Sequence, residues 1–152
     1  MKLVVQRVLE ASVSVEGRTI GKIGQGYLVL LGACDSDSEG TCDKMLKKLI
    51  NLRIFRDSEG KTNLSIKDVG GDLLIVSQFT LYADCRKGNR PAFIKAGSPE
   101  HANSLYEYFI EHARKDYDMH VETGEFGADM TVSIVNQGPF TVVLDSVELG
   151  IE

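Results

Sequence analysis

Apolar residues near the start of the chain alternate with polar ones, which is the period of a β-strand. Residues 3–15 follow this pattern and are rich in valine, so we expect one long or bulged strand there. A turn at 16–18, a short returning strand at 19–23 and a second turn at 24–26 lead to the apolar run 27–32. Together these segments predict an antiparallel meander.

Two later segments carry the period of an amphipathic helix. In residues 42–50 the apolar side chains recur at i, i+3, i+4, i+7 and i+8, with three lysines on the polar face. A second helix is expected from about Ser98, a suitable N-cap, with Pro99 at the first helical position. Its apolar stripe comprises Ala102, Leu105, Tyr106, Phe109, Ile110 and Ala113.

The remaining apolar runs predict further strands at 72–81, 130–135 and 141–144, the last two joined by a hairpin-like turn containing Gly138 and Pro139. With shorter extended segments added to these six strands, we expect about seven or eight strands and two helices. We therefore expect an α+β fold, with a mostly antiparallel, barrel-like β-sheet and two main helices. The sequence contains no internal repeat or linker, so residues 1–152 are expected to form a single domain.

Composition narrows the class of protein. A chain of 152 residues with 43% hydrophobic residues can bury a core without disulfides or a structural metal. Its longest apolar runs fall far short of the roughly 20 residues that span a bilayer. The segment 1–7 reaches a charge too early for a signal peptide. We therefore expect a cytoplasmic protein with no membrane partner.

Common catalytic and cofactor motifs are absent from the sequence. Cys34, Cys42 and Cys85 have no zinc-ligand or C-x-x-C spacing, and the three histidines show no H-E-x-x-H pattern. There is no P-loop, no G-x-G-x-x-G before a helix and no G-x-S-x-G elbow. We expect no metal and no cofactor.

The segment Ser77, Gln78, Phe79 and Thr80 ends an otherwise apolar strand, and three of its four side chains, all except that of Phe79, are polar. Unsatisfied polar groups inside a buried strand cost free energy. Two interpretations remain open: the strand end opens into a pocket, or the hydroxyl groups bond back to their own backbone.

A local reversal of charge follows this segment. The formal net charge of the chain is −5, yet residues 85–98 contain Arg86, Lys87, Arg90 and Lys95 and no acidic residue. Binding to a nucleic-acid backbone needs neighbouring cations rather than a basic protein, so this loop is a candidate phosphate-binding segment. A simply solvated loop would have the same composition.

The sequence is compatible with either the cis or the trans isomer of the peptide bond before Pro139.

Three segments in this order resemble the D-aminoacyl-tRNA deacylase family, formerly called D-tyrosyl-tRNA deacylases. They are 77–81 (SQFTL), 88–91 (GNRP) with Phe93, and 136–141 (NQGPFT), and the likeness extends to 1–8 and 126–130. The resemblance implies a cytoplasmic homodimer that hydrolyses the ester between a D-amino acid and the terminal ribose of tRNA. Glycine mischarged on the tRNA for alanine is a further substrate of such enzymes.

The resemblance also implies roles for individual residues. Gly138 and Pro139, joined by a cis bond, would enter the partner subunit's pocket, bind the substrate's α-ammonium and exclude L side chains. Ser77, Gln78, Phe79 and Thr80 would build the catalytic pocket and stabilise the oxyanion, with Ala102 lining it. We place the tRNA on Arg86, Lys87, Arg90 and Lys95 as a hypothesis.

An aminoacyl ester is already activated, so backbone donors could supply much of the acceleration without a catalytic triad. A threonine hydroxyl without a neighbouring base is a poor nucleophile. We therefore favour a role for Thr80 in shaping the pocket over a covalent role. Two other functions stay open at this point. One is a non-catalytic tRNA-binding module, and the other is a Thr80-dependent hydrolase of small amino-acid esters.

Overall fold

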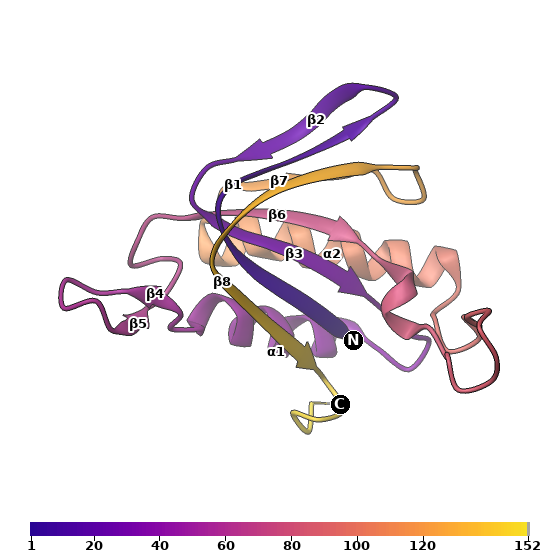
Figure 1. Cartoon of the computed structure of the whole chain (residues 1–152). Coiled ribbons are helices and arrows are strands. Elements are labelled where there is room, and N and C mark those ends of the chain that lie inside the picture. The colour runs from indigo at the N-terminus through magenta and orange to yellow at the C-terminus, as the bar shows by residue number, and fades with distance from the viewer. Residues whose placement is uncertain (152) are drawn as a thin grey trace.

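The computed structural model describes residues 1–151 and consists of a curved sheet covered on one side by two helices (Figure 1). The elements, in chain order, are β1 (Lys2–Val15), β2 (Arg18–Ile23), β3 (Gly26–Gly32), α1 (Glu39–Asn51), β4 (Phe55–Arg56), β5 (Thr62–Leu64), β6 (Asp72–Ser77), the 3-10 helix η1 (Phe79–Tyr82), α2 (Pro99–Tyr117), β7 (Val121–Thr123) and β8 (Thr131–Asp145).

The long strand β1 organises the main sheet. It pairs antiparallel with β3 through its first half and with β2 through its second half, and β8 pairs along its other edge. The sheet continues from β3 to β6 and β7 through parallel pairings. Among the described residues four of the six pairings are antiparallel, which confirms the mostly antiparallel α+β prediction.

The sheet curls until β2 approaches β6 and β7, which gives the barrel-like shape. Gly21 of β2 marks this approach, because a Cβ at its position would lie 2.8 Å from the carbonyl oxygen of Thr123 in β7. A side chain at this position would push the two strands apart. The expected barrel-like closure is therefore present, and it depends on close backbone contact.

Two apolar cores lie on the two faces of the sheet. Leu73 and Ile75 of β6 pack toward the helices, whereas Leu74 and Val76 pack inside the curled sheet. Because β6 is buried on both faces, its sequence is a continuous apolar run rather than an alternation. The helices contribute their predicted apolar stripes to the larger core.

The first helix begins with a capping box, in which Ser38 and Thr41 exchange side-chain and backbone hydrogen bonds. The second begins at Pro99 as predicted, but the side chain of Ser98 makes no capping hydrogen bond. Its backbone N–H instead donates to Asp35 Oδ1 at 2.8 Å. The N-cap position was therefore correct and its expected side-chain chemistry was not.

Two predicted strand boundaries were wrong. The strand expected over 72–81 ends at Ser77, where the chain turns into η1. The hairpin expected around Gly138 and Pro139 is absent, because both residues lie within the single strand β8. This strand stays paired with β1 on both sides of Gly138, and register shifts around Val8 of β1 absorb the irregularity.

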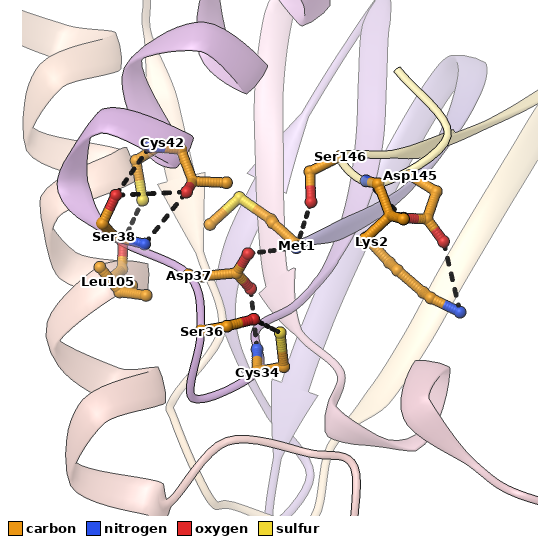
Figure 2. A network of polar contacts seen from close by, with 12 residues as sticks. Met1, Lys2, Cys34, Ser36, Asp37, Ser38, Cys42, Leu105, Asp145 and Ser146 are labelled. Atoms are coloured by element: carbon orange, nitrogen blue, oxygen red, sulfur yellow. Dashed lines mark hydrogen bonds and ion pairs between the residues drawn. The ribbon is translucent and has the colours of Figure 1, made fainter. Parts of the chain in front are cut away.

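The α-ammonium group of Met1 is buried between the two layers (Figure 2). It donates to Asp37 Oδ1 at 2.5 Å and to Ser146 Oγ at 2.7 Å. The other carboxylate oxygen of Asp37 accepts from the backbone N–H of Cys34 at 2.8 Å. This pairing fixes the start of β1 against the segment before α1 and the residue that follows β8.

Candidate functional site

A cavity of about 300 Å³ lies where β6 ends. Two chain segments line it, one from the end of β6 and one that leads into β8. The first supplies Val76, Ser77, Gln78 and Phe79, and the second supplies Phe126, Gly127, Ala128, Asp129, Met130 and Val132. The structure thus places three of the four predicted catalytic residues at one cavity and favours the pocket interpretation of this segment.

The end of β6 explains why these side chains reach the cavity. The backbone N–H of Gln78 donates to the carbonyl of Leu31 at 2.7 Å, and the chain then turns into η1. Thr80, on that turn, is exposed and does not line the cavity. Among the described residues, its hydroxyl is hydrogen-bonded by the Gln78 side-chain amide alone, at 2.5 Å. An amide is not a base, so this contact does not activate the hydroxyl as a nucleophile.

Phe79 connects the cavity to the cationic loop. Its side chain is 54% exposed and meets the ring of Phe93 edge to face, with 5.1 Å between ring centroids. The loop itself is closed by a pair of backbone hydrogen bonds between Asp84 and Ala92. The predicted phosphate-binding segment therefore lies beside the candidate pocket.

One of the four loop cations is neutralised within the loop. The guanidinium of Arg86 forms hydrogen bonds to both carboxylate oxygens of Asp84, with Nη2 at 2.5 Å from Oδ2. These bonds and the backbone N–H of Arg86 hold the pKa of Asp84 well below its usual range. Lys87, Arg90 and Lys95 remain exposed and take no part in the ion pairs of residues 1–151. The acidic residue just before the predicted segment weakens its charge.

Gly138 and Pro139 lie outside the cavity of their own chain. The bond between them is cis, and Gly138 has φ of +121°. A Cβ on Gly138 would lie 2.9 Å from Nη2 of Arg7, so this position requires glycine both for its backbone conformation and for space. Both residues are exposed on the surface of β8.

Arg7 is a residue of this region that the sequence analysis missed. It is only 2% exposed, and its side chain donates to the carbonyls of Gln137 and Ile54. Its guanidinium also lies over the ring of Phe140, 4.8 Å from the centroid. Burial and the neighbouring Arg56 lower the pKa of Arg7. The alternation Leu3, Val5, Arg7 was the available signal, because it places the arginine in a row of buried side chains.

A second cavity of about 610 Å³ lies between α2 and β7 and shares Phe126 with the first. Two of its polar side chains, those of Arg114 and Tyr106, are already hydrogen-bonded to the sheet. Arg114 donates to the carbonyl of Val121 at 2.6 Å, and the Tyr106 hydroxyl donates to the carbonyl of Ile75 at 2.8 Å. These contacts tie α2 to β6 and β7 and leave the smaller cavity as the stronger candidate.

The chain matches the family model described as D-Tyr-tRNA(Tyr) deacylase over residues 4–145. The chain belongs to this family. It is 56% identical to the D-aminoacyl-tRNA deacylase of Thermosipho melanesiensis and 53% identical to that of Clostridioides difficile, in each case over 96% of this chain and 97% of the relative. The solved structure of a "c-Myc DNA Unwinding Element Binding Protein" superimposes with a TM-score of 0.91 at 44% identity, covering 96% of this chain and 99% of that one.

The members of this family are enzymes that hydrolyse ester bonds. The match confirms the resemblance that was drawn from the three sequence segments. Ala102, which that resemblance assigned to the pocket, lies in the first turn of α2 and is buried in the larger core. It does not line the cavity that holds Ser77. Residues 126–130, recognised only as part of the family likeness, supply half of the cavity wall.

No helix in the described part of this deacylase-family chain combines the length and apolar character that crossing a bilayer requires. Within the same residues, no group of three or more histidine, cysteine, aspartate or glutamate side chains is placed to hold a metal ion.

Proposed function

We propose that this chain hydrolyses the ester bond between a D-amino acid and the terminal ribose of tRNA, releasing tRNA and the free D-amino acid. The observation that carries the proposal is the 52–56% identity, over almost the whole chain, to relatives named D-aminoacyl-tRNA deacylase. The cavity at the end of β6 provides a site of suitable size for an amino acid. Because the substrate is a component of translation, we propose that the enzyme works in the cytoplasm.

The proposed chemistry uses water and backbone donors. Water attacks the ester carbonyl, the tetrahedral oxyanion forms, and the ribose oxygen leaves with a proton. We assign the backbone N–H groups at the start of η1, in Phe79 and Thr80, to the oxyanion, because the first N–H groups of a helix have no partner inside it. Ser77, Gln78 and Phe79 shape the pocket, and Thr80 holds the Gln78 side chain in position.

Chiral selection is proposed to come from a second copy of the chain. Gly138 and Pro139 of one protomer would enter the pocket of its partner, with their carbonyl oxygens accepting from the substrate's α-ammonium group. A rigid acceptor pair leaves no room for an L side chain, and glycine escapes rejection because it has no side chain. Glycine mischarged on the tRNA for alanine is therefore included among the proposed substrates.

Two observations support this arrangement. Gly138 and Pro139 are exposed and line no cavity formed by Ser77 to Phe79 of their own chain. The surrounding strands also expose apolar side chains, which a second copy would cover. These side chains are Leu9 at 49%, Ile134 at 39%, Val135 at 43% and Val143 at 63% exposure. The same interface would make the protein a homodimer.

The proposal is tested by measuring deacylation of D-Tyr-tRNA, L-Tyr-tRNA and Gly-tRNA with purified protein in the presence of a chelator. We expect rapid loss of the D-tyrosyl and glycyl esters and no loss of the L-tyrosyl ester above the no-protein control. Binding of the tRNAs without hydrolysis would instead identify a tRNA-binding module. Sedimentation velocity of the same sample should give the mass of two chains, and a monomer would remove the cross-subunit part.

A further inference from the structure

A basic groove of about 500 Å³ lies along the second half of α1 and the segment that follows it. We use the name α1 groove for this surface. Four of its six lining residues are cations and none is acidic. The lining consists of Lys44, Lys47, Lys48, Asn51, Leu52 and Arg53.

Two cations of the α1 groove, Lys47 and Lys48, have no carboxylate partner in the described part of the chain. Both side chains are exposed. The carboxylates of the turn between β4 and β5 are occupied locally. Asp57 accepts from the backbone N–H groups of Glu59 and Lys61, and the side chains of these two residues form an ion pair of their own at 3.4 Å. In a chain with a formal net charge of −5, Lys47 and Lys48 therefore make this part of the surface locally positive.

Helix stability does not account for the whole cluster. A cation in the last turn of a helix interacts favourably with the helix dipole, and Lys48 occupies that turn. Lys44 and Lys47 lie before the last turn, and Arg53 lies beyond the end of the helix. The lining contains one apolar side chain, Leu52, and no aromatic residue, whereas protein interfaces are centred on apolar and aromatic anchors. The composition favours the phosphates of a nucleic acid over a protein surface.

The position of the α1 groove relates it to Gly138 and Pro139. Ile54, the residue after Arg53, accepts a hydrogen bond from Arg7 Nη1 at 2.6 Å, and the same guanidinium donates to the carbonyl of Gln137. One side chain thus bridges the end of the groove and the residue before Gly138. The end of α1 and the β4–β5 hairpin lie on the opposite side of the protomer from η1 and its following loop (Figure 1). The groove is therefore remote from the cavity of its own chain.

We propose that the α1 groove binds the phosphate backbone of the tRNA whose aminoacyl end occupies the pocket of the partner subunit. This inference rests on the proposed function, in which Gly138 and Pro139 enter that pocket. Because the groove lies next to Gly138, the contact that places Gly138 in the partner's pocket also places the groove at the rim of that pocket. Each protomer then contributes the catalytic cavity for one tRNA and part of the docking surface for the other.

The first test compares a charge-reversed variant, Lys47→Glu with Lys48→Glu, with a control that makes the same change at Lys67 and Lys115, two exposed lysines that line neither the α1 groove nor the cavity at Ser77. Each protein is assayed on D-Tyr-tRNA and on D-tyrosyl-adenosine, which has the ester but no phosphate backbone. We expect the groove variant to raise KM for the tRNA by about tenfold or more and to flatten its dependence on salt. Activity on D-tyrosyl-adenosine and all activities of the control should match the unmodified protein.

The two substrates separate the possible failures. If the unmodified protein cleaves neither ester, the proposed function is wrong. If it cleaves both and the groove variant keeps normal tRNA kinetics, the groove does not bind tRNA, an acidic protein becomes the better partner, and the inference alone is overturned. An equal loss on both substrates also overturns it, because the lysines would then act through the fold or the pocket.

A mixed dimer tests the cross-subunit part. The groove variant is co-expressed with a chain whose pocket is disabled by Gln78→Ala and Phe79→Ala and which alone cleaves neither ester. If the groove serves the partner's pocket, each mixed dimer contains one complete site, and random pairing restores about a quarter of the activity on D-Tyr-tRNA. If the groove serves its own pocket, no site is complete and no activity returns, which would overturn the proposed geometry.

Discussion

Arg7 donates two hydrogen bonds to the carbonyl oxygen of Gln137, from Nε at 3.2 Å and from Nη2 at 3.0 Å. A third bond runs from Nη1 to the carbonyl of Ile54. One buried guanidinium therefore joins β1, β8 and the segment after α1 just before Gly138. Lysine offers no planar fork and cannot reproduce this geometry.

We expect Arg7→Lys to lower the free energy of unfolding by about 2 kcal/mol, because at least one buried carbonyl loses its donor. Deacylation of D-Tyr-tRNA should fall by about tenfold or more in kcat/KM, since the chain before Gly138 is no longer held. Urea unfolding and steady-state kinetics measure the two effects. Arg18→Lys, an exposed change on β2, is the matched control and should leave both unchanged. Normal kinetics in Arg7→Lys would show that this contact does not position Gly138.

Thr80→Ala should retain deacylase activity within about tenfold of the unmodified protein. Its hydroxyl accepts from the Gln78 amide and has no base beside it, so its loss removes a positioning contact rather than a nucleophile. Single-turnover kinetics on D-Tyr-tRNA give the chemical rate directly. A loss of all activity would instead favour the Thr80-dependent ester hydrolase and contradict the water mechanism.

The cations of the loop after η1 should not contribute equally to tRNA binding. Lys87→Ala and Arg90→Ala should each weaken binding, and each should reduce the slope of log Kd against log salt concentration by about one. Arg86→Ala should have a smaller effect, because Asp84 already neutralises that guanidinium. Filter-binding titrations at several salt concentrations measure the slopes. Unchanged binding in Lys87→Ala and Arg90→Ala would remove this loop from the tRNA surface.

Cys42 should be the least reactive of the three thiols. Burial, followed by the charges of Asp37 and Asp43, raises its pKa to about 12. At pH 8 a thiol reagent should label the exposed Cys85 rapidly and Cys42 only after unfolding. Mass spectrometry of timed samples distinguishes the sites. Rapid labelling of Cys42 in the folded protein would contradict its burial.

The same shift predicts a loss of stability in alkali. The unfolded thiol ionises near pH 8.5, whereas the folded thiol stays protonated to about pH 12, so the unfolded state gains from deprotonation as pH rises between these values. By pH 10 this difference amounts to about 1–2 kcal/mol. Urea unfolding at pH 7.5 and pH 10 should show a larger decline for the unmodified protein than for Cys42→Ala. Equal declines would assign the alkaline loss to other groups.

Asp37→Asn should destabilise the fold by about 3 kcal/mol. The substitution leaves the buried α-ammonium group of Met1 without its anion, and breaking a buried ion pair from one side costs more than the pair contributes. Asp35→Asn, three residues from the cap of α1, removes a carboxylate in contact with the N–H of Ser98 and is the control, with an expected effect below about 1 kcal/mol. Thermal unfolding of both variants measures the difference.

The sequence predicted elements best where one period dominated. The stripes of both helices and the long strand β1 were placed correctly, because a row of buried side chains along one element imposes a regular spacing. The strand β8 was wrongly predicted as two strands, because glycine and proline usually interrupt a strand. Here the pairing with β1 keeps Gly138 and Pro139 within a single strand. Pairing between segments so far apart in the chain leaves no local signal.

The candidate site was predicted in part for a similar reason. Ser77 and Gln78 stood out as polar side chains after an apolar run, whereas the opposite wall at 126–130 has no chemical motif and becomes a wall only through folding. The cationic loop stood out by its charge, but the pairing of Arg86 with Asp84 depends on how the loop closes. Arg7 was hidden within a strand pattern that was interpreted only for its apolar residues.

The pairing of β1 with β8 has a consequence for synthesis of the protein. Lys2 lies opposite Asp145, so one edge of the first strand has no partner until nearly the whole chain has left the ribosome. During translation β1 can pair with β2 and β3, but its outer edge stays open to other chains. A transcript cut short before β8 would therefore produce a chain with an exposed β-edge and no Gly138. Such a truncated chain would be bound by chaperones or degraded by proteases and would not act as a weak enzyme.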